Sequence, residues 1–185
     1  YREFALTAPW TSKGKVSERT GMPQALKDIG LWMRIRGPLG PEDGTPGEMN
    51  RELIEAQRFF DVPMGLHWYD WHVIPYDNQY PHYFPEKPRF RERFQDLAAR
   101  GWVVMPYING RIVDTLNDDF DRFLPHTVKD QAGKPFLEVY GPQSGRMTVM
   151  CPWTRFWQEE VAGIVGRLGR DLGVNAVYID QVSAS

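Results

Sequence analysis

The side chains best suited to catalysis stand where predicted strands end, and Asp180 is the clearest of them. It closes the apolar run Val177, Tyr178 and Ile179. A carboxylate in that position is costly unless a site solvates it or hydrogen bonds satisfy it. Alternation along a strand places Tyr178 and Asp180 on one face and Val177 and Ile179 on the other. We therefore expect Asp180 to point away from the packed face, as a catalytic carboxylate or, alternatively, as a cap of the following turn.

A second polar group, His67, Asp70 and His72, lies around the predicted strand 64–71. These residue types bind zinc and iron, but a strand puts His67 on the face opposite Asp70 and His72. The sequence therefore predicts no metal site here, and we expect no cofactor. Asp70 is better suited to accepting two sugar hydroxyls at once. The alternative is a buried carboxylate paired with an arginine of the preceding strand.

Further candidates lie at the ends of two other predicted strands. Asn109 offers both a donor and an acceptor, which suits a sugar hydroxyl. Tyr107, Arg111 and Gln181 are also placed where they could contact a substrate. For Arg111, capping of the loop is the simpler explanation.

Aromatic residues are unusually frequent. Seven Trp, eight Tyr and ten Phe make up 14% of the 185 residues. Such rings either form a large core or line a cleft for flat sugar rings. The polar residues between the rings of the loop 72–87 favour a site over a satellite core. The rings around this loop are Trp68, Trp71, Tyr76, Tyr80, Tyr83 and Phe84.

Strands and helices alternate along most of the chain. Periodicity and Gly/Pro boundaries predict strands at 29–36, 64–71, 102–109 and 175–180, and helices at 49–60, 89–99 and 157–172. Pro106 is awkward inside the third strand, because proline removes one ladder donor. Between residues 110 and 150 we expect a short helix near 114–124 and an extended piece near 135–140.

This alternation predicts an α/β fold with parallel strands joined by helical crossovers. A doubly wound sheet and a (β/α)8 TIM-type barrel both fit. The long loops after the second and third strands favour the barrel, whose βα loops build the active site, and no glycine-rich phosphate motif is present. Four βα units are half of a barrel. We therefore expect 1–28 to be a lead-in segment and 29–185 to be the N-terminal half of a barrel, completed by a remaining half.

Composition excludes some partners. A net charge of −2 gives no electrostatic reason to expect nucleic acid or an anionic membrane. No apolar run approaches the roughly 20 residues of a membrane span. The single cysteine, Cys151, excludes an internal disulfide and leaves the redox compartment open.

Several segments together resemble a known group of enzymes. The stretch from Phe84-Pro85 through the helix 89–99 and Gly101 to the strand 103–109 is similar to a passage in retaining α-glycosidase barrels. The segment Leu172-Gly-Val-Asn-Ala-Val-Tyr-Ile-Asp-Gln181 resembles the fourth-strand signature of the α-galactosidase and α-glucosidase superfamily. Residues 65–72, 80–85 and 105–111 are similar to a family of large bacterial proteins with a glycosidase-like barrel. The resemblance covers residues 29–181.

The resemblance implies a function. In that superfamily the fourth-strand Asp is the nucleophile, a role that would fall to Asp180, and the acid/base comes from a later strand. It therefore implies a glycoside hydrolase that is inactive as this chain alone and acts on an oligosaccharide or glycoside. Gln181 departs from the pattern of the better-known α-glycosidases. The alternatives are a non-catalytic carbohydrate-binding or scaffold barrel and a metal-dependent hydrolase. The residues expected to line the sugar site are Asp70, Trp71, His72, Tyr107, Asn109, Arg111 and Gln181.

Overall fold

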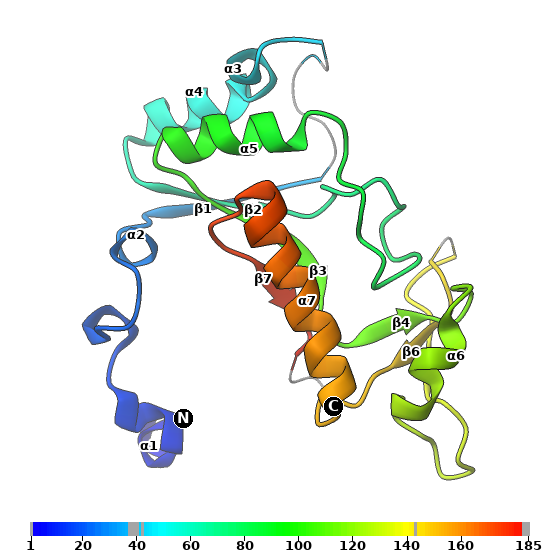
Figure 1. Ribbon diagram of the computed structural model, residues 1–185. Helices are drawn as coiled ribbons and strands as arrows, with labels where there is room; N and C mark the ends of the chain where they lie inside the picture. Colours follow the sequence, from blue (N-terminus) through cyan, green and yellow to red (C-terminus); the bar gives the residue numbers. More distant parts are fainter. Residues whose placement is uncertain (1, 37–40, 42, 143, 183–185) are drawn as a thin grey trace.

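The computed structural model describes residues 2–36, 41, 43–142 and 144–182 (Figure 1). Its centre is a four-stranded parallel sheet in the order β1-β2-β3-β7. The strands are β1 (Leu31–Ile35), β2 (Met64–Trp68), β3 (Val103–Asn109) and β7 (Tyr178–Asp180). The predicted α/β class with parallel strands is therefore confirmed. The second strand is shorter than expected, because the chain leaves the sheet after Trp68 rather than after Trp71.

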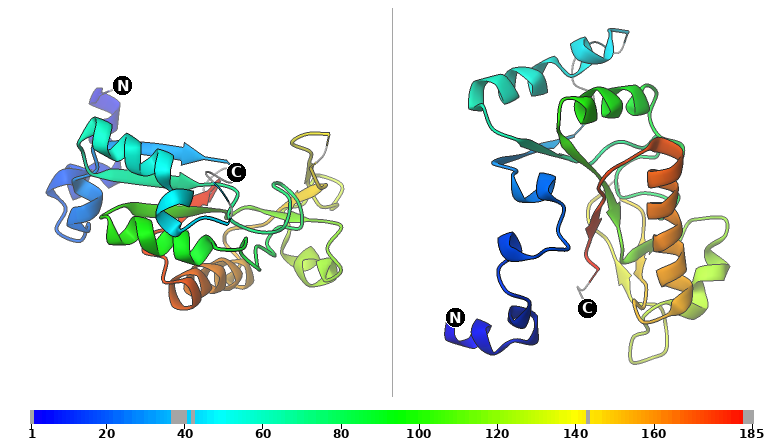
Figure 2. Two further views of the ribbon diagram at one scale, coloured as in Figure 1. Left: turned by 90° about the horizontal axis from the view of Figure 1, so that it is seen from above. Right: turned by 60° about the vertical axis from the view of Figure 1, so that its left-hand side comes forward.

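Helices connect these strands. They are α3 (Pro46–Met49), α4 (Arg51–Phe60), α5 (Phe90–Ala99) and α7 (Arg155–Leu172). The longer three follow one another around the outside of the sheet (Figures 1 and 2). Their apolar stripes, represented by Leu53, Phe94 and Leu168, share one buried cluster with Leu66 and Val104 of the strands. This arrangement buries one face of the sheet.

Helix α7, which delivers the chain to β7, has clear start and stop signals. The Thr154 side chain accepts a hydrogen bond from the Trp157 amide at its N-terminus. Gly173 ends it with a φ of 71°, a left-handed conformation that glycine adopts without steric cost. Trp157, Leu168 and Leu172 are its buried residues. Burial of this stripe fixes where β7 begins.

The other face of the sheet carries the polar and aromatic residues of interest. Strand alternation places Trp32, His67, Tyr107 and Asp180 on this inner face. Trp32 packs over Gly65, where an added Cβ would lie 2.3 Å from the indole ring. Trp32 is nevertheless 43% exposed. The described residues therefore cover the inner face only in part.

The segment between β3 and α7 forms a second, smaller sheet. It is antiparallel, in the order β4-β6-β5. Its elements are β4 (Ile112–Asp114), α6 (Phe120–Phe123), η3 (Leu124–His126), β5 (Leu137–Glu138) and β6 (Met147–Val149). The predicted helix 114–124 is therefore wrong in its first half, because Asp114 belongs to the strand that pairs with 147–149 and residues 115–119 form turns. A cluster of Val113, Phe123, Met150 and Trp157 attaches this sheet to α7.

The first residues form short helical turns apart from the sheet (Figure 2). These are α1 (Arg2–Thr7), η1 (Pro9–Lys13), η2 (Val16–Glu18) and α2 (Gln24–Lys27). Neither buried cluster of the described residues includes a residue from this segment. No helix in the described ranges has the length and apolarity of a bilayer span.

Candidate functional site

The carboxyl ends of the four parallel strands gather side chains that lie far apart in the sequence. Asn109 stands beside Asp180 in the β3–β7 register, and Arg34 stands beside His67 in the β1–β2 register. Of the predicted site residues, Tyr107, Asn109, Asp180 and Gln181 come together here. Asp70, Trp71, His72 and Arg111 take other positions, described below.

Asp180 is half-buried and held by two phenols. The Tyr107 hydroxyl donates to its Oδ2 at 3.2 Å, and the Tyr178 hydroxyl donates to its Oδ1 at 3.5 Å. Burial raises the pKa of Tyr107 above its ordinary value. Its hydroxyl therefore stays protonated and available as a donor. Two such donors fix the orientation of the Asp180 carboxylate.

Asn109, only 2% exposed, connects this pair to the next residue of the site. Its Oδ1 accepts the backbone N–H groups of Arg111 at 2.8 Å and Ile112 at 3.2 Å. Its Nδ2 donates to the Tyr107 hydroxyl at 3.1 Å and to Gln181 Oε1 at 3.2 Å. A continuous hydrogen-bonded chain therefore runs from Gln181 through Asn109 and Tyr107 to Asp180.

Arg111 binds the antiparallel sheet. Its guanidinium donates two hydrogen bonds, of 2.7 and 2.8 Å, to Glu138. That interaction lowers the pKa of Glu138, so this carboxylate is ionised and accepts the Tyr140 hydroxyl at 2.5 Å. The Tyr140 oxygen in turn lies 3.2 Å from Gln181 Oε1. Arg111 thus places Tyr140 beside the site.

Asp70 pairs with Lys87 rather than with an arginine of β1. The Lys87 Nζ lies 2.6 Å from Asp70 Oδ2, and both side chains remain partly exposed. An ion pair in this setting contributes at most about 1 kcal/mol. Asp70 therefore keeps carboxylate oxygens that a hydroxyl can reach.

Trp71 and His72 lie in the core, each with no exposed surface. The Trp71 indole N–H donates to the Tyr107 carbonyl at 2.7 Å, and His72 Nδ1 lies 2.8 Å from the Ile74 carbonyl. Tyr80 and Tyr83 are equally buried. For these rings the structure supports the core interpretation.

Asp77 and Arg36 lie outside the set of residues expected from the sequence to line the sugar site. Burial raises the pKa of Asp77, which Arg36 opposes and the nearby Asp180 reinforces. The Arg36 guanidinium lies 4.7 Å from the centre of the Tyr76 ring. Asp77 also has a φ of 57°, uncommon for a residue with a Cβ. The sequence showed Asp77 only as a polar residue within an aromatic loop. Because Asp77 lies outside any predicted strand, strand alternation could not predict where its side chain lies.

His67, which the sequence suggested only as a possible metal ligand, also lies near Asp180. Its ring lies 4.0 Å from the Tyr178 ring between their centres. Burial lowers the pKa of His67, and the charge of Asp180 partly opposes that shift. Neutral His67 is therefore part of the aromatic surroundings of Asp180. Within the described ranges, no group of three or more His, Cys, Asp or Glu residues could hold a metal ion.

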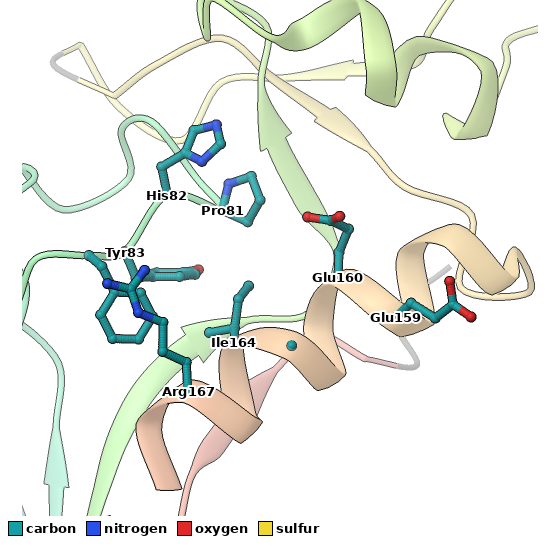
Figure 3. Close-up of a pocket in the computed structure, with 9 residues that line it drawn as sticks. Pro81, His82, Tyr83, Glu159, Glu160, Ile164 and Arg167 are labelled. Atoms are coloured by element: carbon teal, nitrogen blue, oxygen red, sulfur yellow. The ribbon is translucent and has the colours of Figure 1, made fainter. Parts of the chain in front are cut away.

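A separate pocket of about 300 Å³ lies between the 81–84 segment and α7 (Figure 3). Glu160 points toward Pro81 and His82, whereas Glu159 points away from the opening. Its polar side chains are already paired, Glu160 with Arg122 and His82 with Asp119. We assign no function to this pocket.

Comparisons with known proteins identify a family and relatives that match the whole chain. The family model described as "Domain of unknown function (DUF6259)" matches residues 1–185. A Bacteroides thetaiotaomicron protein named "Putative glycoside hydrolase" is 32% identical over 191 residues, covering 100% of this chain and 26% of that protein. A Monosiga brevicollis protein named "Putative glycoside hydrolase 22789" is 28% identical over 215 residues, covering 100% of this chain and 18% of that protein. The chain thus spans about a quarter or less of these relatives.

Solved structures of glycosidases share the fold. The α-N-acetylgalactosaminidase NagBb from Bifidobacterium bifidum, in complex with GalNAc, matches with a TM-score of 0.63 and 15% identity, over 80% of this chain and 27% of that one. The α-galactosidase TtGalA from Thermus thermophilus matches with a TM-score of 0.53 and 14% identity, over 79% of this chain and 31% of that one. At such identities the likeness concerns the fold alone.

Proposed function

Because this chain belongs to the DUF6259 family over its whole length, and its curated relatives are named as glycoside hydrolases, we propose that it forms part of a glycoside hydrolase. In this proposal residues 29–185 are the N-terminal half of a (β/α)8 barrel, 1–28 are a lead-in segment, and a remaining half closes the barrel. The substrate is an oligosaccharide or glycoside.

Asp180 is the proposed nucleophile. The observation that carries this assignment is its position at the carboxyl end of β7, on the inner face, with both carboxylate oxygens hydrogen-bonded by phenols. Catalytic groups of barrel enzymes come from the carboxyl ends of strands. The two phenols would keep one carboxylate oxygen aimed at the sugar.

The proposed chemistry is retaining hydrolysis. The Asp180 carboxylate attacks C1 of the sugar, and the bond from C1 to the leaving oxygen breaks. An acid on a later strand protonates that oxygen. Water, deprotonated by the same later residue, then cleaves the ester and returns Asp180 as a carboxylate.

The proposed sugar site combines residues at these strand ends with Asp70 of the loop after β2. Gln181 and the partly exposed Asp70 would bind hydroxyls directly. Tyr107 and Asn109 would hold Asp180 and Gln181 in place. Trp71 would hold Tyr107 in place through the hydrogen bond to its carbonyl, and the buried His72 would stabilise the loop. Arg111 would position Tyr140 beside Gln181 through its ion pair with Glu138.

The test is to replace Asp180 by Asn in the full-length protein and to measure hydrolysis of chromogenic α- and β-glycosides. We expect activity to fall at least about a hundredfold, because an amide cannot form the covalent intermediate. Asp118→Asn, an equal change at an exposed turn position, is the matched control.

Equal activity in wild type and Asp180→Asn would overturn the nucleophile assignment. Sugar binding without hydrolysis in either protein would instead support a non-catalytic carbohydrate-binding barrel. NMR detection of the first-formed anomer would decide between retention and inversion.

A further inference from the structure

The orientation of the Gln181 carboxamide follows from the backbone after β3. Asn109 Oδ1 accepts two backbone N–H groups, from Arg111 and Ile112. Its other atom, Nδ2, is therefore the nitrogen and acts as a donor toward Gln181. A donor must meet an acceptor, so the Gln181 atom beside Asn109 is the oxygen Oε1. The amide nitrogen of Gln181 then lies on the other side of its carboxamide group.

The contact with Tyr140 does not change this orientation of the Gln181 carboxamide. A phenol has one hydrogen to donate. The ionised Glu138 is its closer acceptor, at 2.5 Å against 3.2 Å for Gln181 Oε1. Burial, followed by the hydrogen bond to Glu138, raises the pKa of Tyr140 to about 12. Tyr140 therefore remains a phenol whose hydrogen is directed to Glu138.

The two N–H groups of Gln181 have no acceptor among the described residues. The amide nitrogen that carries them is also accessible to solvent, because it is not one of the buried side-chain nitrogens that lack a hydrogen-bond partner. The Gln181 backbone has a φ of 59°, which fixes an unusual direction for its side chain. The residue directly follows Asp180 in the chain.

We propose that Gln181 is a specificity-determining residue. Its side-chain amide donates a hydrogen bond to a sugar hydroxyl oxygen near the carbon that Asp180 attacks. The inference rests on the proposed function. The hydrogen bond from Gln181 selects sugars that carry an acceptor oxygen at that position and disfavours their deoxy analogues. A site that hydrogen-bonds a substrate group discriminates strongly against the analogue that lacks it.

The experiment uses the full-length protein and three variants. Gln181→Glu keeps the acceptor for Asn109 and replaces the donor by a second acceptor oxygen. Gln181→Met keeps the approximate length and removes the donor without adding charge. Gln131→Glu, at an exposed position of the antiparallel part, controls for the added negative charge. Each protein is assayed with the best glycoside and with its monodeoxy analogues.

For the wild type we expect one monodeoxy analogue to lose about 10–100-fold in kcat/KM. On the parent glycoside, the kcat/KM of Gln181→Glu and of Gln181→Met should fall by a similar factor. On that one analogue, the kcat/KM of both variants should equal that of the wild type. The two changes act on the same hydrogen bond, so their effects are not additive. Gln131→Glu should behave as wild type.

Binding of the product sugar by Asp180→Asn, with and without Gln181→Met, gives a readout that needs no turnover. We expect at least about tenfold weaker binding in the double variant. If Asp180→Asn abolishes activity while the Gln181 variants match wild type on every analogue, this inference is overturned and the proposed function stands. If Asp180→Asn retains full activity, the proposed function itself is overturned.

Discussion

His72 illustrates what burial does to a single ionisable side chain. Its Nδ1 faces the Ile74 carbonyl, so this nitrogen carries the hydrogen of the neutral ring. Its Nε2 is buried and has no hydrogen-bond partner among the residues that the structure describes. A proton added there would therefore be a buried charge without an acceptor. Burial accordingly lowers the pKa of His72 below its ordinary value.

This lowered pKa predicts sensitivity to acid. Above the unfolded pKa, about 6.5, neither state binds the proton and His72 costs nothing. As the pH falls below it, the unfolded chain takes up a proton that the folded protein rejects, so stability is lost. We expect the melting temperature of His72→Asn, which keeps a donor for Ile74, to fall less than that of wild type between pH 7.5 and 5.5.

His72→Phe serves as the comparison. It cannot be protonated either, but it loses the bond to Ile74, so its melting temperature should be lower at every pH with an equally flat profile. Parallel profiles for the wild type and both variants would contradict this account of His72.

The sequence predicted side-chain chemistry better than side-chain position. Alternation correctly placed Asp180 opposite Ile179, because both lie in β7; the predicted residues 175–177 lie outside that strand. It could not place Trp71 and His72, because the chain leaves β2 after Trp68 and the periodicity no longer applies. Asp70 and Lys87 form an ion pair although they are 17 positions apart in an irregular loop, and no local pattern encodes this pairing.

At the scale of elements, the glycines of the sheet and of helix α7 have opposite roles. Gly65 of β2 leaves room for Trp32 of β1, whereas nothing lies within 4 Å of a Cβ added to Gly169 in α7. We expect Gly65→Ala to destabilise the protein by about 1–3 kcal/mol through overpacking. Gly169→Ala should stabilise it by about 0.5–1 kcal/mol, because alanine restricts the unfolded chain. Urea unfolding of the full-length protein measures both changes.

A double variant tests the cause. In Trp32→Ala the ring is gone, so adding Gly65→Ala to it should cost much less than adding it to wild type. Equal costs in the two backgrounds would mean that strain elsewhere, not contact with Trp32, opposes the larger residue.

Elements with strong local periodicity were predicted well, and those made by distant pairing were not. Helix 155–172 has an unbroken apolar stripe and two caps, and its predicted range was close. Strand 112–114 exists because it pairs with 147–149, about 35 positions later. Pro106 is accommodated because β7 pairs with β3 only from Tyr107 onward, which leaves the proline one strand neighbour.

At the scale of the molecule, the sheet is open. Among the described residues β1 and β7 each pair along one side only, and the inner face exposes Trp32. Unpaired edges and exposed rings promote association. If 29–185 is half of a barrel, we expect residues 1–185 expressed alone to self-associate and to bind the dye ANS, in contrast to the full-length protein. Co-expression with the remainder of the protein should suppress both.

A monomeric 1–185 product without dye binding would contradict the half-barrel proposal. Light scattering gives the mass, and ANS fluorescence gives the exposed apolar surface. The sequence led to the half-barrel by counting βα units, and the parallel order of the four strands agrees with that count. Closure of the proposed barrel would depend on strands beyond these four, so no local feature of residues 1–185 predicts it.

The two backbone N–H groups that hold Asn109 carry a consequence for how such proteins diverge. They fix which atom of the Asn109 amide faces Gln181. In the proposed site this decides whether position 181 offers hydrogens or lone pairs to the substrate. Remodelling the tight bend after β3 would reverse that choice without altering Tyr107, Asp180 or Gln181. Relatives with identical residues at those three places can therefore prefer different sugars, and a directed-evolution library aimed at new preferences should randomise the bend at 110–112.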